Sequence, residues 1–91
     1  MTSALNECAH SEGYNTLASG KYSFAGGCQT SALGTNTIAL GNKTHAEGYC
    51  AFACGDAVSA LNSETFAIGW NNTATGQYAF VGGKNSTASG S

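Results

Sequence analysis

The side chains of this 91-residue chain that could bind a metal or carry out catalysis are few. They are two histidines (His10, His45), four cysteines (Cys8, Cys28, Cys50, Cys54) and five acids (Glu7, Glu12, Glu47, Asp56, Glu64). The acids are scattered, no serine, histidine and aspartate fall at spacings that a fold would bring together, and there is no phosphate-binding loop. The cysteines lack the two close pairs that a zinc site requires. We therefore expect neither enzymatic activity nor a cofactor.

Aromatic side chains could serve a different chemistry, the recognition of a sugar or a protein by ring stacking. Tyr14, Tyr49 and Trp70 each directly follow a glycine, so we expect them next to turns. They are candidates for surface binding. The alternative is that these rings, like Tyr22 and Tyr78, only cover the edges of the fold.

The glycines define the elements that must position these side chains. Eleven of the thirteen fall on one seven-residue grid: Gly13, Gly20, Gly27, Gly34, Gly41, Gly48, Gly55, Gly69, Gly76, Gly83 and Gly90. Asn6 and Asn62 occupy the two remaining grid points, and Asn tolerates left-handed backbone best after Gly. The residue two before each grid point is nearly always alanine. A fixed period of this kind predicts a repeat fold.

The residue three before the grid point shows that the repeat is two heptads long. One series is mostly apolar: His10, Phe24, Ile38, Phe52, Phe66 and Phe80. The other is mostly polar: Ser3, Leu17, Ser31, His45, Ser59, Thr73 and Thr87. We expect a single domain over residues 1–91, with a half-repeat at 1–7 and six 14-residue coils at 8–21, 22–35, 36–49, 50–63, 64–77 and 78–91.

Each heptad predicts a strand of about five residues and a tight turn, in which glycine supplies a positive φ. Two strands and two turns make one coil of an all-β parallel solenoid, with coils stacked about 4.8 Å apart. Because side chains alternate along a strand, the alanines and the small residues two before them point inward. The flanking residues point outward.

The outward residues of the apolar series would form a stripe too large for a monomer in water. The small interior is also too thin to stabilise the chain alone. We therefore expect other copies of the chain to cover the stripe in a closed oligomer. The predicted interface is Phe24, Ile38, Leu40, Phe52, Cys54, Phe66, Ile68, Phe80 and His10. Copies of His10 would converge on the axis, packed or holding an ion, whereas His45 would face solvent.

The same spacing separates the cysteines. Cys8 and Cys50 would lie three coils apart, about 14 Å, which exceeds the reach of a disulfide. Cys28 would be two coils from Cys50 and Cys54, also too far. The thiols are therefore expected to be free, with bridges between chains as the alternative.

Composition excludes several functions. The net charge is −2 and there is no basic patch, so we expect no nucleic acid binding. No apolar run is long enough to insert into a membrane, and the first residues do not form a signal peptide.

Two stretches carry a resemblance to a known family, Thr65-Phe66-Ala67-Ile68-Gly69-Trp70-Asn71-Asn72 and Asn36-Thr37-Ile38-Ala39-Leu40-Gly41-Asn42-Lys43-Thr44. They resemble the head repeats of trimeric autotransporter adhesins (the YadA-like head, or Hep/Hag heptad repeats), whose pattern is roughly N-S-V-A-I-G-x-x-S. The half-repeats 45–49 and 17–22 look like versions found in phage and prophage fibre proteins. The resemblance implies a left-handed parallel β-roll in a tight homotrimer, with the apolar strands facing the axis. Here Phe predominates where that family more often has Val.

What the resemblance implies for function is adhesion or structure outside the cell. We expect a non-enzymatic head or fibre segment of a bacterial surface or phage tail protein, with a host surface protein or glycan as partner. The alternative is a structural filament whose subunits stack end to end through uncapped coils.

Overall fold

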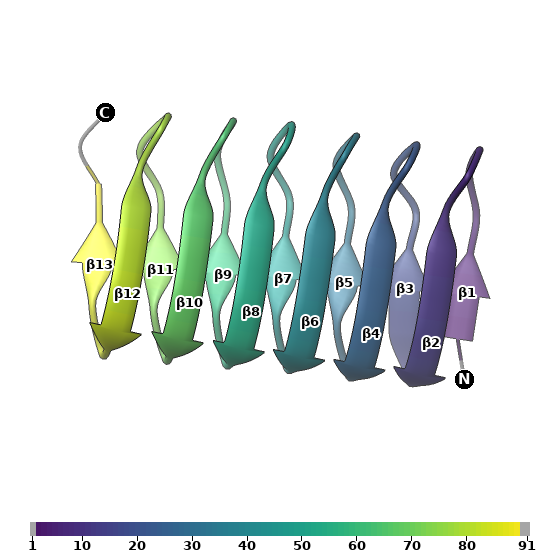
Figure 1. Ribbon diagram of the computed structural model, residues 1–91, viewed down its shortest axis with the longest axis horizontal. Helices are drawn as coiled ribbons and strands as arrows, with labels where there is room; N and C mark the ends of the chain where they lie inside the picture. Colours follow the sequence, from purple (N-terminus) through teal and green to yellow (C-terminus); the bar gives the residue numbers. More distant parts are fainter. Residues whose placement is uncertain (1, 90–91) are drawn as a thin grey trace.

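The computed structural model describes residues 2–89, and these form thirteen β-strands. The strands are β1 (Thr2–Ala4), β2 (His10–Tyr14), β3 (Thr16–Ala18), β4 (Phe24–Cys28), β5 (Ser31–Ala32), β6 (Ile38–Asn42), β7 (His45–Ala46), β8 (Phe52–Asp56), β9 (Ser59–Ala60), β10 (Phe66–Trp70), β11 (Thr73–Ala74), β12 (Phe80–Lys84) and β13 (Thr87–Ala88). Odd-numbered strands form a seven-stranded sheet and even-numbered strands a six-stranded sheet. The two sheets lie back to back, with turns along both long edges (Figure 1).

All strand pairs are parallel, and each pairs residues 14 apart, such as Phe52 with Phe66 and Ala60 with Ala74. Backbone hydrogen bonds also join the coils outside the strands, for example from Asn36 N to Lys21 O at 2.9 Å. The predicted all-β parallel solenoid with 14-residue coils and two short strands per coil is confirmed.

The interior consists of small side chains, as the repeat predicts. From Ala18 to Ala74 every alanine two before a grid point is fully buried. The second inner column is also buried and includes Thr16, Ser23, Thr30, Thr37, Thr44, Ala51, Val58, Thr65, Asn72 and Ala79. Because these residues are small, the sheets approach closely, and the Cα atoms extend only 10 Å along the shortest axis against 32 Å along the stack.

Hydroxyls of the second inner column stabilise the turns. Ser23 Oγ donates a hydrogen bond to Gly20 O at 2.6 Å, and Thr37 Oγ1 donates to Gly34 O at 2.8 Å. Each bond links an inner side chain to a backbone carbonyl at the start of its own turn. Ser23 and Thr37 therefore contribute both their small size and a hydrogen bond, whereas the buried hydroxyls of Thr30 and Thr44 have no partner among the described residues.

The grid glycines fall into two classes, which corrects the expectation that each supplies a positive φ in a turn. Gly13, Gly27, Gly41, Gly55, Gly69 and Gly83 have positive φ, between +114° and +130°, but lie within strands. Gly20, Gly34, Gly48 and Gly76 lie outside the strands, beside the turns, and none of them has a positive φ. Gly90 lies outside the described residues.

Contact between stacked coils explains why glycine occupies the grid in both classes. A Cβ atom built on Gly20 would overlap the carbonyl group of Gly34, and one built on Gly41 would overlap that of Gly55. The left-handed residue of each turn is two positions later, as at Tyr22 and Cys50, and no described one is glycine. Glycine is therefore selected by the close approach of the next coil rather than by the turn itself.

Asn6 and Asn62 occupy the grid for a different reason from the one expected, because neither is left-handed. The side-chain amide of Asn62 donates to Thr75 O in the next coil at 3.1 Å, and its oxygen accepts from Ser63 N at 2.8 Å. Asn6 repeats this pattern with Ser19 O and Glu7 N. Each asparagine thus adds a side-chain link between coils where a glycine would have none.

Candidate interaction surfaces

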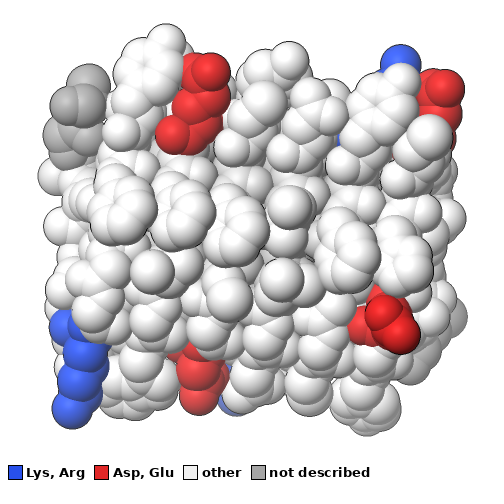
Figure 2. Space-filling model, in the orientation of Figure 1, with Lys and Arg blue, Asp and Glu red and all other residues white. Residues whose placement is uncertain are grey.

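The outer surface of the six-stranded sheet carries two columns of side chains that run along the solenoid. The first column is His10, Phe24, Ile38, Phe52, Phe66 and Phe80, and the second is Glu12, Gly26, Leu40, Cys54, Ile68 and Gly82. We call the residues of these columns from β4 to β12 the apolar face. Figure 2 shows this side of the molecule as an uncharged band, with acidic and basic side chains toward its margins.

The rings of the first column stack on one another. The ring centroids of Phe52 and Phe66 lie 4.7 Å apart and those of Phe66 and Phe80 lie 5.0 Å apart, with interplanar angles of 5°. The imidazole of His10 stacks on Phe24 at 4.6 Å. Stacking of this kind contributes about 0.5–1.5 kcal/mol per pair beyond the burial of area. Ile38 interrupts the ladder between Phe24 and Phe52.

Side chains of the first column lean over glycine positions of the second column. The ring edge of Phe24 approaches the position where Gly26 would carry a Cβ, at 3.2 Å, and Phe80 approaches that of Gly82 at 3.7 Å. Each ring thereby covers a strand backbone that has no side chain of its own. The apolar face is therefore continuous, although two of its ten positions are glycine.

The two outer surfaces of the solenoid differ sharply. Phe80 is 66% exposed and Ile38 36% exposed, and the other apolar side chains of the face are partly exposed. On the opposite side, the positions that match the first column are mostly serine, threonine or histidine, with Leu17. The positions that match the second column include Leu5, Leu33 and Leu61 but no aromatic residue. All predicted interface residues lie together on one face, and the described chain alone leaves this face open to water.

The aromatic residues proposed for surface binding are exposed but do not cluster. Tyr14 ends β2 and Trp70 ends β10, so they lie at the same edge of the sheet and are separated by four coils. Tyr49 lies in a turn at the opposite edge. The ammonium of Lys84 lies 5.4 Å from the centroid of the Trp70 ring, a cation–π contact that partly covers it.

The remaining chemically active groups are dispersed. All four cysteines are free thiols, of which Cys8 and Cys50 are exposed and Cys28 and Cys54 partly exposed. Within residues 2–89 of one chain, no three metal-ligating side chains come together and the surface has no pocket. The same residues include no helix long and apolar enough to span a membrane.

A parallel solenoid of 14-residue coils, with glycine at nearly every seventh position, is a structural repeat domain. Comparison with known protein families identifies the family of this repeat. The YadA head domain repeat matches in two copies, over residues 32–53 and 60–86, which together make up more than half of the chain. The chain therefore belongs to the family of YadA head domain repeats. No match was found among curated proteins or among solved structures. YadA-type head domains are surface-exposed structural domains of adhesins.

Proposed function

We propose that this chain is a non-enzymatic head or fibre segment that presents a rigid homotrimer of left-handed β-rolls for attachment to a surface. Three copies pack with their six-stranded sheets toward a common axis, and the seven-stranded sheets face outward. The protein of which this segment is part acts outside the cell, on a bacterial surface or in a phage tail fibre.

The observation that carries the proposal is the apolar face. Phe52, Phe66 and Phe80 project from a sheet whose opposite side already packs against the interior, and no segment within residues 2–89 covers them. Burying a phenylalanine side chain fully contributes about 1.5–3 kcal/mol. Four phenylalanines and three aliphatic residues per chain therefore favour association strongly, whereas the interior of alanine and threonine gives little stability.

A pair of charge substitutions tests the assembly. In Phe66→Asp, an unpaired carboxylate must enter the seam between copies, which costs several kcal/mol per chain. Ser59→Asp places the same charge on the seven-stranded sheet, where it stays in water. Light scattering after size exclusion should give three times the 9.1 kDa chain mass for the natural sequence and for Ser59→Asp. Phe66→Asp should give monomer or aggregate.

The same experiment has outcomes that contradict the proposal. Equal behaviour of the two variants would mean that the apolar face is not the interface. A mass that grows with concentration would instead support the end-to-end filament. A stable monomer of the natural sequence would exclude both assemblies.

Adhesion requires a separate test with the assembled protein. Labelled trimer should bind to a panel of glycans or matrix proteins, and Trp70→Ala and Tyr49→Ala should reduce that binding without changing the mass. Variants that bind as well as the natural sequence would show that these rings only cover the edges of the roll.

A further inference from the structure

A five-residue motif, H-x-E-G-Y, occurs twice in the chain. The first copy is His10-Ser11-Glu12-Gly13-Tyr14 in β2, and the second is His45-Ala46-Glu47-Gly48-Tyr49, which begins in β7. Because alternate residues of a strand share a face, His and Glu project together on the outside while the central Ser or Ala points inward. The motif therefore places an imidazole and a carboxylate side by side on the surface of each sheet.

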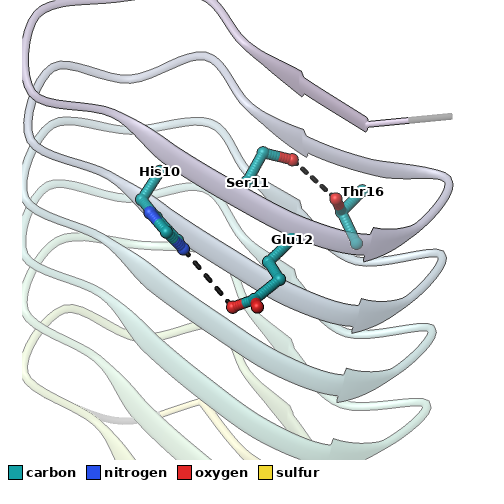
Figure 3. Close-up of polar contacts among 4 residues, drawn as sticks. All are labelled: His10, Ser11, Glu12 and Thr16. Atoms are coloured by element: carbon teal, nitrogen blue, oxygen red, sulfur yellow. Dashed lines mark hydrogen bonds and ion pairs between the residues drawn. The ribbon is translucent and has the colours of Figure 1, made fainter.

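Figure 3 shows the first pair: the His10 ring and the Glu12 carboxylate point toward each other, whereas Ser11 turns to the interior and contacts Thr16. His10 Nε2 and Glu12 Oε1 are 3.4 Å apart, and the side chains are 55% and 76% exposed. The second pair, His45 Nε2 and Glu47 Oε2, is 3.7 Å apart. Neither pair has another acid, histidine or cysteine within reach among the described residues of the chain.

The separation of the first pair suits chelation of one ion. Two ligand atoms that are each about 2.1 Å from a divalent metal, at angles of 90–110°, lie about 3.0–3.4 Å apart. The His10–Phe24 stack, with a centroid separation of 4.6 Å, also fixes the plane of the imidazole. A side chain that is already fixed before the ion binds loses less conformational entropy on binding, so the entropic cost of binding is lower. Two ligands alone hold a divalent ion weakly, so the site needs ligands from other copies.

The position of the two pairs in the fold distinguishes them. His10 continues the first column of the apolar face, in register with Phe24, and Glu12 continues the second, in register with Gly26. In a trimer built on that face, three copies of this pair surround the axis. His45 and Glu47 belong to the seven-stranded sheet, so their three copies point away from one another.

We infer that the trimer binds one divalent transition-metal ion on its axis at β2, through Nε2 of three His10 side chains and the carboxylates of three Glu12 side chains. Imidazole with carboxylate is a ligand set that suits zinc, nickel, cobalt and iron in their divalent states. The inference rests on the proposed trimer, and it adds to it a site that no single copy contains. Bound metal links the three chains at the end of the apolar face where the phenylalanine column has ended.

The test uses tag-free protein stripped with a chelator, dialysed against cobalt or zinc, and analysed for metal content and mass in the same sample. The natural sequence should retain one ion per three chains. His10→Ala should lose it, with affinity falling at least about 100-fold, and Glu12→Gln should weaken it about 10–100-fold. His45→Ala removes the same motif from the other sheet and should bind as the natural sequence does. All variants keep the four thiols, and absence of the thiolate-to-cobalt absorption separates the axial site from cysteine ligation.

The outcomes separate this inference from the proposed trimer. Trimers that hold no ion, or that lose it equally in His10→Ala and His45→Ala, would overturn the metal site and leave the assembly intact. One ion per chain would also overturn it, because it would mean that each pair binds alone. If the natural sequence is not a trimer, the proposed function fails first, and this is visible in the measured mass.

Discussion

Replacing Gly41 with alanine should disrupt the solenoid, although the change adds a single methyl group. Gly41 lies in the central strand β6 at φ +116°, and its added Cβ would overlap the carbonyl oxygen of Gly55 in the next coil. The two coils would have to separate by about 1 Å or more to restore van der Waals contact. The backbone hydrogen bonds nearby, such as Ala57 N to Asn42 O at 2.8 Å, would lengthen with them.

The expected cost follows from these two effects. A side chain at this φ costs roughly 1–2 kcal/mol. Weakening two or three ladder hydrogen bonds adds about 1 kcal/mol each. The total of roughly 4 kcal/mol is a large part of the free energy of unfolding of a small domain. For a chain of this length it corresponds to a fall of about 15–30 °C in the melting temperature.

Gly82→Ala is the matched control, because a Cβ at Gly82 would make ordinary contacts with Ile68 at 3.5 Å and Phe80 at 3.7 Å. It should leave stability unchanged or raise it by about 0.4–1 kcal/mol. Thermal melts followed by circular dichroism, at one protein concentration, compare the three proteins. If Gly41→Ala melts within a few degrees of the natural sequence, close coil contact does not explain the glycine grid.

One further substitution and two deletions test the repeat. Asn62→Asp removes the donor to Thr75 O and should lower the free energy of unfolding by about 1–2 kcal/mol in urea titrations, with Asn62→Gly as the control that fits the grid. An aspartate variant as stable as the natural sequence would mean that this inter-coil bond contributes nothing. Deleting one whole coil, residues 36–49, should leave a shorter protein that still folds and assembles. Deleting residues 36–42 should abolish assembly, because every later apolar strand then moves to the other sheet; normal assembly of this variant by size exclusion would contradict the two-heptad repeat.

Much of the fold could be predicted because small inner residues and large outer residues recur at fixed positions of the repeat. Alanine at nearly every seventh position and the alternation of Phe66 with residues such as Ser59 define the interior, the two sheets and the apolar face. Positions that follow directly from strand alternation agree with the structure.

The role of individual glycines could not be predicted. A glycine at a fixed position can be needed for its positive φ or for the space left by its missing side chain, and the sequence does not distinguish the two. Gly20 is required for the space that its missing side chain leaves to the next coil, whereas Gly41 needs that space and also has a positive φ. Likewise Asn62 was expected to be left-handed, but its role depends on an amide bond to Thr75 that only the stacked coils create. The position of His10 in the apolar column was predicted from the sequence, but its pairing with Glu12 was not, and it became clear only when the strand placed both side chains on one surface.

The cysteines of the natural sequence offer the most direct test of the buried apolar face. Cys54 lies on that face in β8, and Cys8 and Cys50 are exposed in turns away from it. Native protein is treated with a bulky maleimide, and labelling of each cysteine is followed by mass spectrometry of its peptides. Cys8 and Cys50 should react rapidly while Cys54 stays protected until the protein is denatured. Labelling of native Cys54 at the rate of Cys8 and Cys50 would show that the apolar face is open to water, which contradicts the trimer built on it.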